Sequence, residues 1–159
     1  MSPPPCYTFS MLGFTKKQDR DPDQFWQEYE EQIGEKVLAK ALGRYMQGWA
    51  EYEGPLWGLV IATSGGFRFH HFPHESWISA LARVSTGSKP PVEKTIFIPR
   101  EKISSVELRI EKRWWKKIFS PVPPMLIISY RTETSQESLY AETELNAKDV
   151  FAALTADEK

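Results

Sequence analysis

The 159-residue sequence contains little cysteine and no long apolar run. Its single cysteine, Cys6, cannot form an internal disulfide, so nothing points to an oxidising compartment. The longest apolar stretches, at residues 56–63 and 125–128, are far shorter than the roughly 20 residues that a membrane-spanning helix needs. The first residues show neither the basic start nor the apolar centre of a signal peptide. We therefore expect a cytoplasmic protein, and peripheral association with a membrane is compatible with this location.

The chain also lacks net charge, because 20 basic residues balance 21 acidic ones. This balance excludes a uniformly basic nucleic-acid-binding protein. It is nevertheless a sum of regions of opposite sign. Residues 100–117 carry seven basic and three acidic side chains, a net charge of +4, whereas residues 19–42 carry three basic and seven acidic ones, a net charge of −4. Any anionic partner is therefore expected at a local patch.

Common catalytic motifs are missing as well. The sequence has no Gly-x-Ser-x-Gly elbow, no phosphate-binding loop and no Gly-x-Gly-x-x-Gly fingerprint. Cys6 has no histidine or carboxylate near it in the sequence, and the pair Glu142 and Glu144 lacks neighbours that would separate their pKa values. We therefore expect no enzymatic activity and no cofactor.

What is present begins with a predicted helix over residues 21–43. Asp21 fits the N-cap position, Pro22 the first helical position and Gln24 the capping-box position, while Gly43 is placed to end the helix. Apolar residues recur along it at spacings of three and four. They are Trp26, Tyr29, Ile33, Val37, Leu38, Ala41 and Leu42. The chain is thus divided into a tail (1–20), an added helix (21–43) for docking or oligomerisation, and a domain (44–159).

In the domain the apolar period changes to two, which predicts strands. The predicted strands are residues 44–52, 56–63, 67–72, 94–98, 103–111, 125–132 and 137–143. A short helix is predicted at 75–83, a loop at 112–124 and a final helix at 147–156 capped by Asn146. The expected fold is mainly β with α: a seven-stranded antiparallel barrel or sandwich closed by the C-terminal helix.

Several short segments resemble the pleckstrin-homology (PH) superfold, especially its GRAM-like and bacterial branches. The segments are Gly58-Leu-Val-Ile-Ala-Thr63, Gly66-Phe-Arg-Phe69, Ile96-Phe-Ile-Pro99, Ile103-Ser-Ser-Val106, Pro124-Met-Leu-Ile-Ile128 and Val150-Phe-Ala-Ala-Leu154. They are similar to the second and third strands, the fourth-strand passage, the sixth strand and the C-terminal helix of that family. The resemblance implies a PH-like binding or scaffolding domain without catalytic activity. Members that bind phosphoinositides carry basic residues in the first loop, whereas Glu51-Tyr-Glu-Gly-Pro is acidic here. The usual phosphoinositide pocket is therefore not expected.

The strongest local candidate for binding is a basic and aromatic cluster in residues 112–119. Its candidate residues are Lys112, Arg113, Trp114, Trp115, Lys116, Lys117 and Phe119. Indole rings favour the headgroup level of a bilayer, and each nearby cation gains on the order of 1 kcal/mol at an anionic leaflet. Three interpretations stay open: a hairpin whose tryptophans cover the barrel wall, a contact with an anionic lipid surface, and a contact with a protein or nucleic acid, which stacks on similar side chains.

Of these partners we expect a protein or an anionic lipid surface rather than nucleic acid. Homo-oligomerisation through an exposed strand edge is an alternative function. A metal-dependent enzyme is a second alternative, because His70, His71, His74 and Glu75 lie within six residues. Adjacent residues of a strand point to opposite faces, so only one of His70 and His71 can join the other two, which makes at most three ligands.

Overall fold

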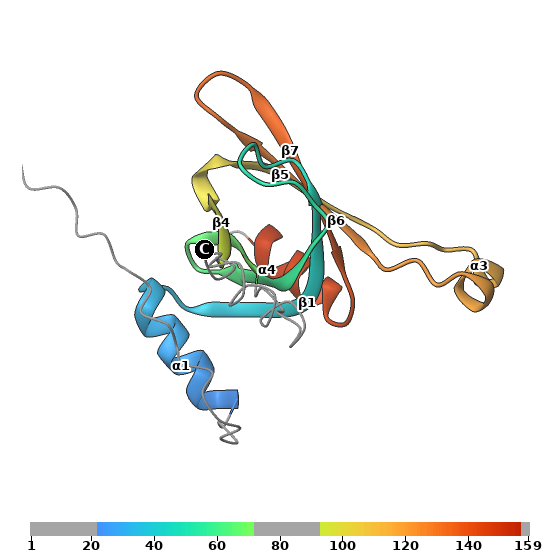
Figure 1. Ribbon diagram of the computed structural model, residues 1–159, viewed down its shortest axis with the longest axis horizontal. Coiled ribbons are helices and arrows are strands. Elements are labelled where there is room, and N and C mark those ends of the chain that lie inside the picture. Colours follow the sequence, from blue (N-terminus) through green and yellow to red (C-terminus); the bar gives the residue numbers. More distant parts are fainter. Residues whose placement is uncertain (1–21, 72–92, 157–159) are drawn as a thin grey trace, which may run out of the picture. The chain divides into compact units, whose positions relative to one another are not determined.

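The computed structural model describes residues 22–71 and 93–156 of the chain (Figure 1). The chain divides into two units, Met1–Ile33 and Gly34–Lys159. The predicted short helix at 75–83 lies outside the described residues. No helix in the described ranges is both long and apolar enough to cross a bilayer.

The first unit contributes helix α1 (Pro22–Ile33), which begins where the sequence predicts but ends earlier. Gly34 follows it with a φ of +68°, the left-handed conformation that favours glycine after a helix. The Gln24 side chain donates to Glu28 at 3.1 Å, one helical turn onward. The prediction of helix from residue 34 to residue 43 is wrong, because Val37–Gln47 forms the first strand.

The second unit is built on one seven-stranded antiparallel sheet, as the sequence predicts. Its strands follow the order β4-β3-β2-β1-β7-β6-β5. Its strands are β1 (Val37–Gln47), β2 (Leu56–Thr63), β3 (Gly66–His71), β4 (Lys94–Pro99), β5 (Ile103–Arg109), β6 (Met125–Arg131) and β7 (Gln136–Thr143). The sheet curves strongly but does not close, because β4 and β5 are its end strands (Figure 1). A single 3₁₀ turn, η1 (Arg100–Lys102), joins them.

Strand β1 links the two halves of the sheet, pairing with β2 along one edge and with β7 along the other. Gly43 lies opposite Gly58 on β2 and Thr143 on β7. A Cβ at Gly43 would lie 2.2 Å from the Glu142 carbonyl oxygen, so a side chain does not fit there. The glycine that the sequence suggests as a helix stop instead permits close approach of two strands.

The core lies inside the curved sheet, and helix α4 (Ala147–Thr155) packs over it through Val150 and Leu154. Asn146 precedes this helix as predicted, and its carbonyl accepts the Val150 N–H at 3.2 Å. Its side chain makes no capping hydrogen bond, however, and its φ is +65°. The predicted side-chain cap is therefore wrong, although the position of the helix is confirmed.

Arg100 connects three parts of this unit. Its guanidinium donates to the carbonyl oxygens of Thr63 (3.0 Å) in β2, Ala153 (3.2 Å) and Leu154 (3.3 Å) in α4. A cation at the C-terminal end of a helix is favourable, since the last carbonyls carry partial negative charge. Arg100 thereby anchors α4 against the turn between β4 and β5.

Candidate functional site

The predicted basic and aromatic cluster lies on an arm, residues 110–124, that connects β5 to β6. Figure 1 shows this arm projecting away from the sheet, with helix α3 (Trp114–Phe119) at its far end. The sequence predicts a loop at residues 112–124, whereas the structure places this six-residue helix within it. We call residues 112–119 the tip.

Helix α3 is short because proline follows it. Ser120 precedes Pro121, and a residue before proline is disfavoured in the helical conformation. Ser120 has a φ of −151° and a ψ of 80°, and its N–H closes the helix on the Lys116 carbonyl at 2.8 Å. No residue of α3 is buried. Packing against the core therefore does not hold this helix in place.

The apolar side chains of the arm are strongly exposed. Phe119 is 83% exposed, Trp114 72% and Ile118 66%, and Trp115 is 46% exposed. Spacings of three (115 to 118) and four (114 to 118 and 115 to 119) make these four side chains neighbours on α3. Exposed apolar groups that gather in this way, bordered by charged residues, mark interaction sites. The interpretation in which the tryptophans cover the barrel wall is therefore wrong.

Four cations accompany the apolar side chains, and one carboxylate precedes them. Glu111 lies 3.5 Å from the Lys116 ammonium and accepts the Arg113 N–H at 3.1 Å. The hydrogen bond from the Arg113 N–H lowers the pKa of Glu111, and the positive charge of Lys116 lowers it further to a smaller extent. The Lys116 ammonium also lies 5.7 Å from the centre of the Trp115 ring. Among the described residues, no carboxylate forms an ion pair with Lys112, Arg113 or Lys117. These three residues are exposed, so their charges face solvent.

Of the histidines singled out by the sequence, the structure describes His70 and His71, and these two contact different partners. His70 is buried and lies 3.1 Å from Glu93, whereas His71 lies 2.6 Å from the Trp57 carbonyl oxygen. Burial lowers the pKa of His70, and the neighbouring carboxylate opposes this shift. His74 and Glu75 lie outside the described residues. Within residues 22–71 and 93–156 no group of three or more potential ligands is placed to hold a metal ion.

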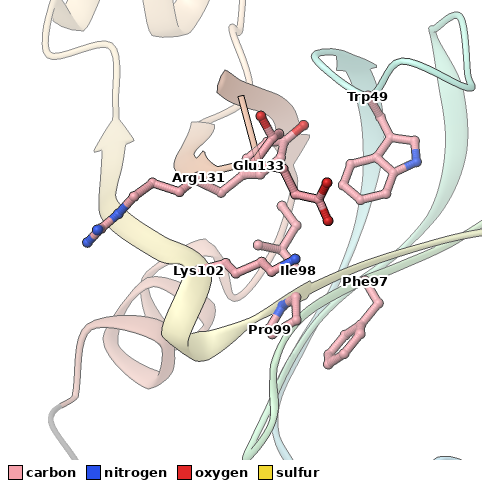
Figure 2. Close-up of a pocket in the computed structure, with 9 residues that line it drawn as sticks. Trp49, Phe97, Ile98, Pro99, Lys102, Arg131 and Glu133 are labelled. Carbon is pink, nitrogen blue, oxygen red and sulfur yellow. The ribbon is translucent and has the colours of Figure 1, made fainter. Parts of the chain in front are cut away.

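A pocket of about 200 Å³ lies far from the tip, beside the turn that joins β6 to β7 (Figure 2). It is lined by Trp49, Phe97, Ile98, Pro99, Lys102, Tyr130, Arg131, Thr132 and Glu133. Sequence reasoning missed this pocket, because its residues come from four separate segments without a local motif. The sheet order separates β4 from β6, and the curvature of the sheet brings them together at the pocket (Figure 1).

Comparison of the chain with protein-family models, curated proteins and solved structures finds no match. The fold that is shown is therefore the seven-stranded antiparallel sheet with its C-terminal helix, which is compatible with a PH-like fold.

Proposed function

We propose that this chain is a PH-like binding module, without enzymatic activity, that attaches to an anionic membrane surface through the tip of its arm. The observation that carries this proposal is the coincidence of exposed apolar side chains and four cations at the end of a projecting arm, where Glu111 lies near only Lys116 among these cations. Trp114, Ile118 and Phe119 are each at least 66% exposed, and four cations lie within the same eight residues.

The two kinds of side chain suit two layers of a bilayer surface. Apolar rings gain free energy by entering the boundary between headgroups and acyl chains, whereas lysine and arginine remain among anionic headgroups. Four cations together contribute on the order of 4 kcal/mol at an anionic surface, at about 1 kcal/mol each. This electrostatic attraction complements the burial of the aromatic rings, so neither contribution acts alone.

A membrane is favoured over the other partners by the shape of the site. Proteins that hold single-stranded nucleic acid place cations along a groove that follows the backbone. The tip instead lies at the end of a projection, where a broad surface is easily reached (Figure 1). The acidic first loop, with Glu51 and Glu53 exposed, provides no basic headgroup pocket. Attachment is therefore expected to depend on surface charge rather than on one phosphoinositide.

Vesicle co-sedimentation tests this proposal. The wild-type chain is expected to pellet with vesicles that contain phosphatidylserine and to remain in solution with pure phosphatidylcholine vesicles. A variant with Lys112, Arg113, Lys116 and Lys117 each replaced by glutamate is expected to lose this binding. A matched charge-reversal variant elsewhere, Lys148→Glu in α4, is expected to bind as the wild type does. Equal pelleting of the wild type and the fourfold variant, or no pelleting of either, would exclude the proposal.

A second candidate function, self-assembly, is favoured by the sheet order. Strands β4 and β5 each have only one pairing partner among the described strands. An unpaired strand edge is a template for pairing with another chain. Light scattering at increasing protein concentration tests this candidate, since a mass that stays at one chain throughout would remove it.

A further inference from the structure

The pocket beside the β6–β7 turn combines an apolar wall with two opposite charges. Trp49, Ile98 and Pro99 provide apolar surface, and the Trp49 ring lies 5.7 Å from the Tyr130 ring. The Phe97 ring points away from this space (Figure 2), and the Arg68 guanidinium lies 3.9 Å from its centre. Figure 2 shows the Lys102 ammonium and the Glu133 carboxylate extending toward the space in front of Trp49, whereas the Arg131 guanidinium points away. The pocket therefore offers one cation, one anion and an aromatic face.

These two charged groups are available to a ligand. Neither the Lys102 nor the Glu133 side chain makes a hydrogen bond or an ion pair within residues 22–71 and 93–156. Tyr130, in contrast, is fully engaged, because its hydroxyl donates to the Gly48 carbonyl oxygen at 2.7 Å and lies 3.1 Å from Glu137. The polar groups free for recognition are thus Lys102 and Glu133, one of each sign.

We propose that this pocket binds a free α-amino acid with an apolar side chain. Its carboxylate is placed against the Lys102 ammonium, and its ammonium against the Glu133 carboxylate and the face of Trp49, which attracts cations. Its side chain packs on the wall formed by Ile98 and Pro99. A ligand of one charge would leave either Lys102 or Glu133 without a counter-ion, so a zwitterion complements the pocket best.

The size of the pocket agrees with this class of ligand. A volume of about 200 Å³ is less than the roughly 300–1,000 Å³ typical of sites for larger organic ligands. Roughly seven water molecules occupy the same volume in the liquid, at about 30 Å³ each. This is the scale of an amino acid and is too small for a nucleotide. The pocket and the tip are separate sites, so this inference does not depend on membrane attachment.

Isothermal titration calorimetry with L-leucine and L-phenylalanine tests the inference, with saturation-transfer NMR as a second readout. The wild type is expected to bind at least one of them saturably. Lys102→Gln and Glu133→Gln are each expected to weaken binding at least fivefold, because each removes one charge-assisted contact. Arg131→Gln is the matched control, since Arg131 also lines the pocket but points away from it, and it is expected to bind as the wild type does.

Ligand analogues assign each charge. N-acetyl-L-leucine lacks the ammonium group, so its weaker binding should be insensitive to Glu133→Gln. L-Leucinamide lacks the carboxylate, so its binding should be insensitive to Lys102→Gln. The inference is overturned if neither amino acid binds up to its solubility limit, if both charge variants bind as the wild type does, or if Arg131→Gln weakens binding as much as they do.

Discussion

The interior of the sheet and the tip of the arm use the same apolar residue types in opposite ways. Phe69 and Ile98 are each 1% exposed inside the sheet, whereas Phe119 is 83% exposed and Ile118 66% exposed at the tip. The difference comes from topology, because strands β3 and β4 face the core while the arm leaves the sheet between β5 and β6. Apolar side chains thus contribute to folding in one region and remain available for binding in the other.

The comparison predicts its largest effect for a matched pair of phenylalanine substitutions. Phe67→Ala, at a fully buried position, is expected to lower the free energy of unfolding by about 3–5 kcal/mol. Phe119→Ala removes the same atoms from an exposed position and is expected to change it by less than about 0.5 kcal/mol. Urea unfolding of both variants measures the difference. Comparable destabilisation by the two would show that the tip packs on the fold.

A smaller effect is predicted within the tip, where Glu111 partly compensates the cations. Glu111→Gln removes the negative charge 3.5 Å from Lys116 but keeps an oxygen that can accept the Arg113 N–H. Affinity for phosphatidylserine vesicles is expected to rise about fivefold, which corresponds to roughly 1 kcal/mol for one charge. Vesicle titration at constant ionic strength measures this change.

Glu107→Gln is the control for that measurement, because it makes the same change of charge on β5. Glu107 pairs with Arg109 at 2.8 Å and does not belong to the tip. It is expected to change vesicle affinity less than Glu111→Gln does. An equal gain from both substitutions would assign the effect to net charge rather than to the position of Glu111.

The smallest effect concerns pH, and it contrasts a buried titratable group with the exposed tip. Burial lowers the pKa of His70 below its ordinary value of 6.5. The unfolded chain therefore binds this proton more readily, so the contribution of His70 to stability is present above about pH 6.5 and is lost as the pH falls below it. His70→Gln should show a weaker loss of stability than the wild type between about pH 7.5 and pH 5.5. Urea unfolding across this range checks the slope, and identical slopes would contradict the assignment.

The sequence pattern predicts six of the seven strands close to their observed positions, whereas the first strand is predicted at 44–52 and lies at Val37–Gln47. β2, for example, occupies residues 56–63 as predicted, and the turn after it contains the expected Ser64 and Gly65. The helical prediction for residues 37–42 fails because Val-Leu-Ala-Lys-Ala-Leu also fits a helical spacing and has good helix formers. Pairing with β2 and β7 overrides that local preference, and Gly34 is the local signal that marks the true end of the helix.

The two candidate sites also differ in how much of each can be predicted from the sequence. The tip is predictable in composition because its cations and aromatic residues are consecutive, but exposure of Trp114 depends on the arm leaving the sheet. The amino-acid pocket has no consecutive signal, since Trp49, Lys102 and Glu133 meet only through the curvature of the folded sheet. Local chemistry can be predicted from sequence, whereas convergence of distant segments requires the topology.

The central claim, that the tip enters an anionic membrane surface, is tested most directly by a fluorophore at position 119. An environment-sensitive dye is attached to Phe119→Cys in a chain whose Cys6 is replaced by serine, and the matched control carries the dye at Ser135→Cys in the exposed β6–β7 turn. With phosphatidylserine vesicles, the emission of the dye at position 119 is expected to shift to the blue, while the emission at position 135 stays unchanged. Unchanged emission at position 119, or equal shifts at both positions, would contradict the account.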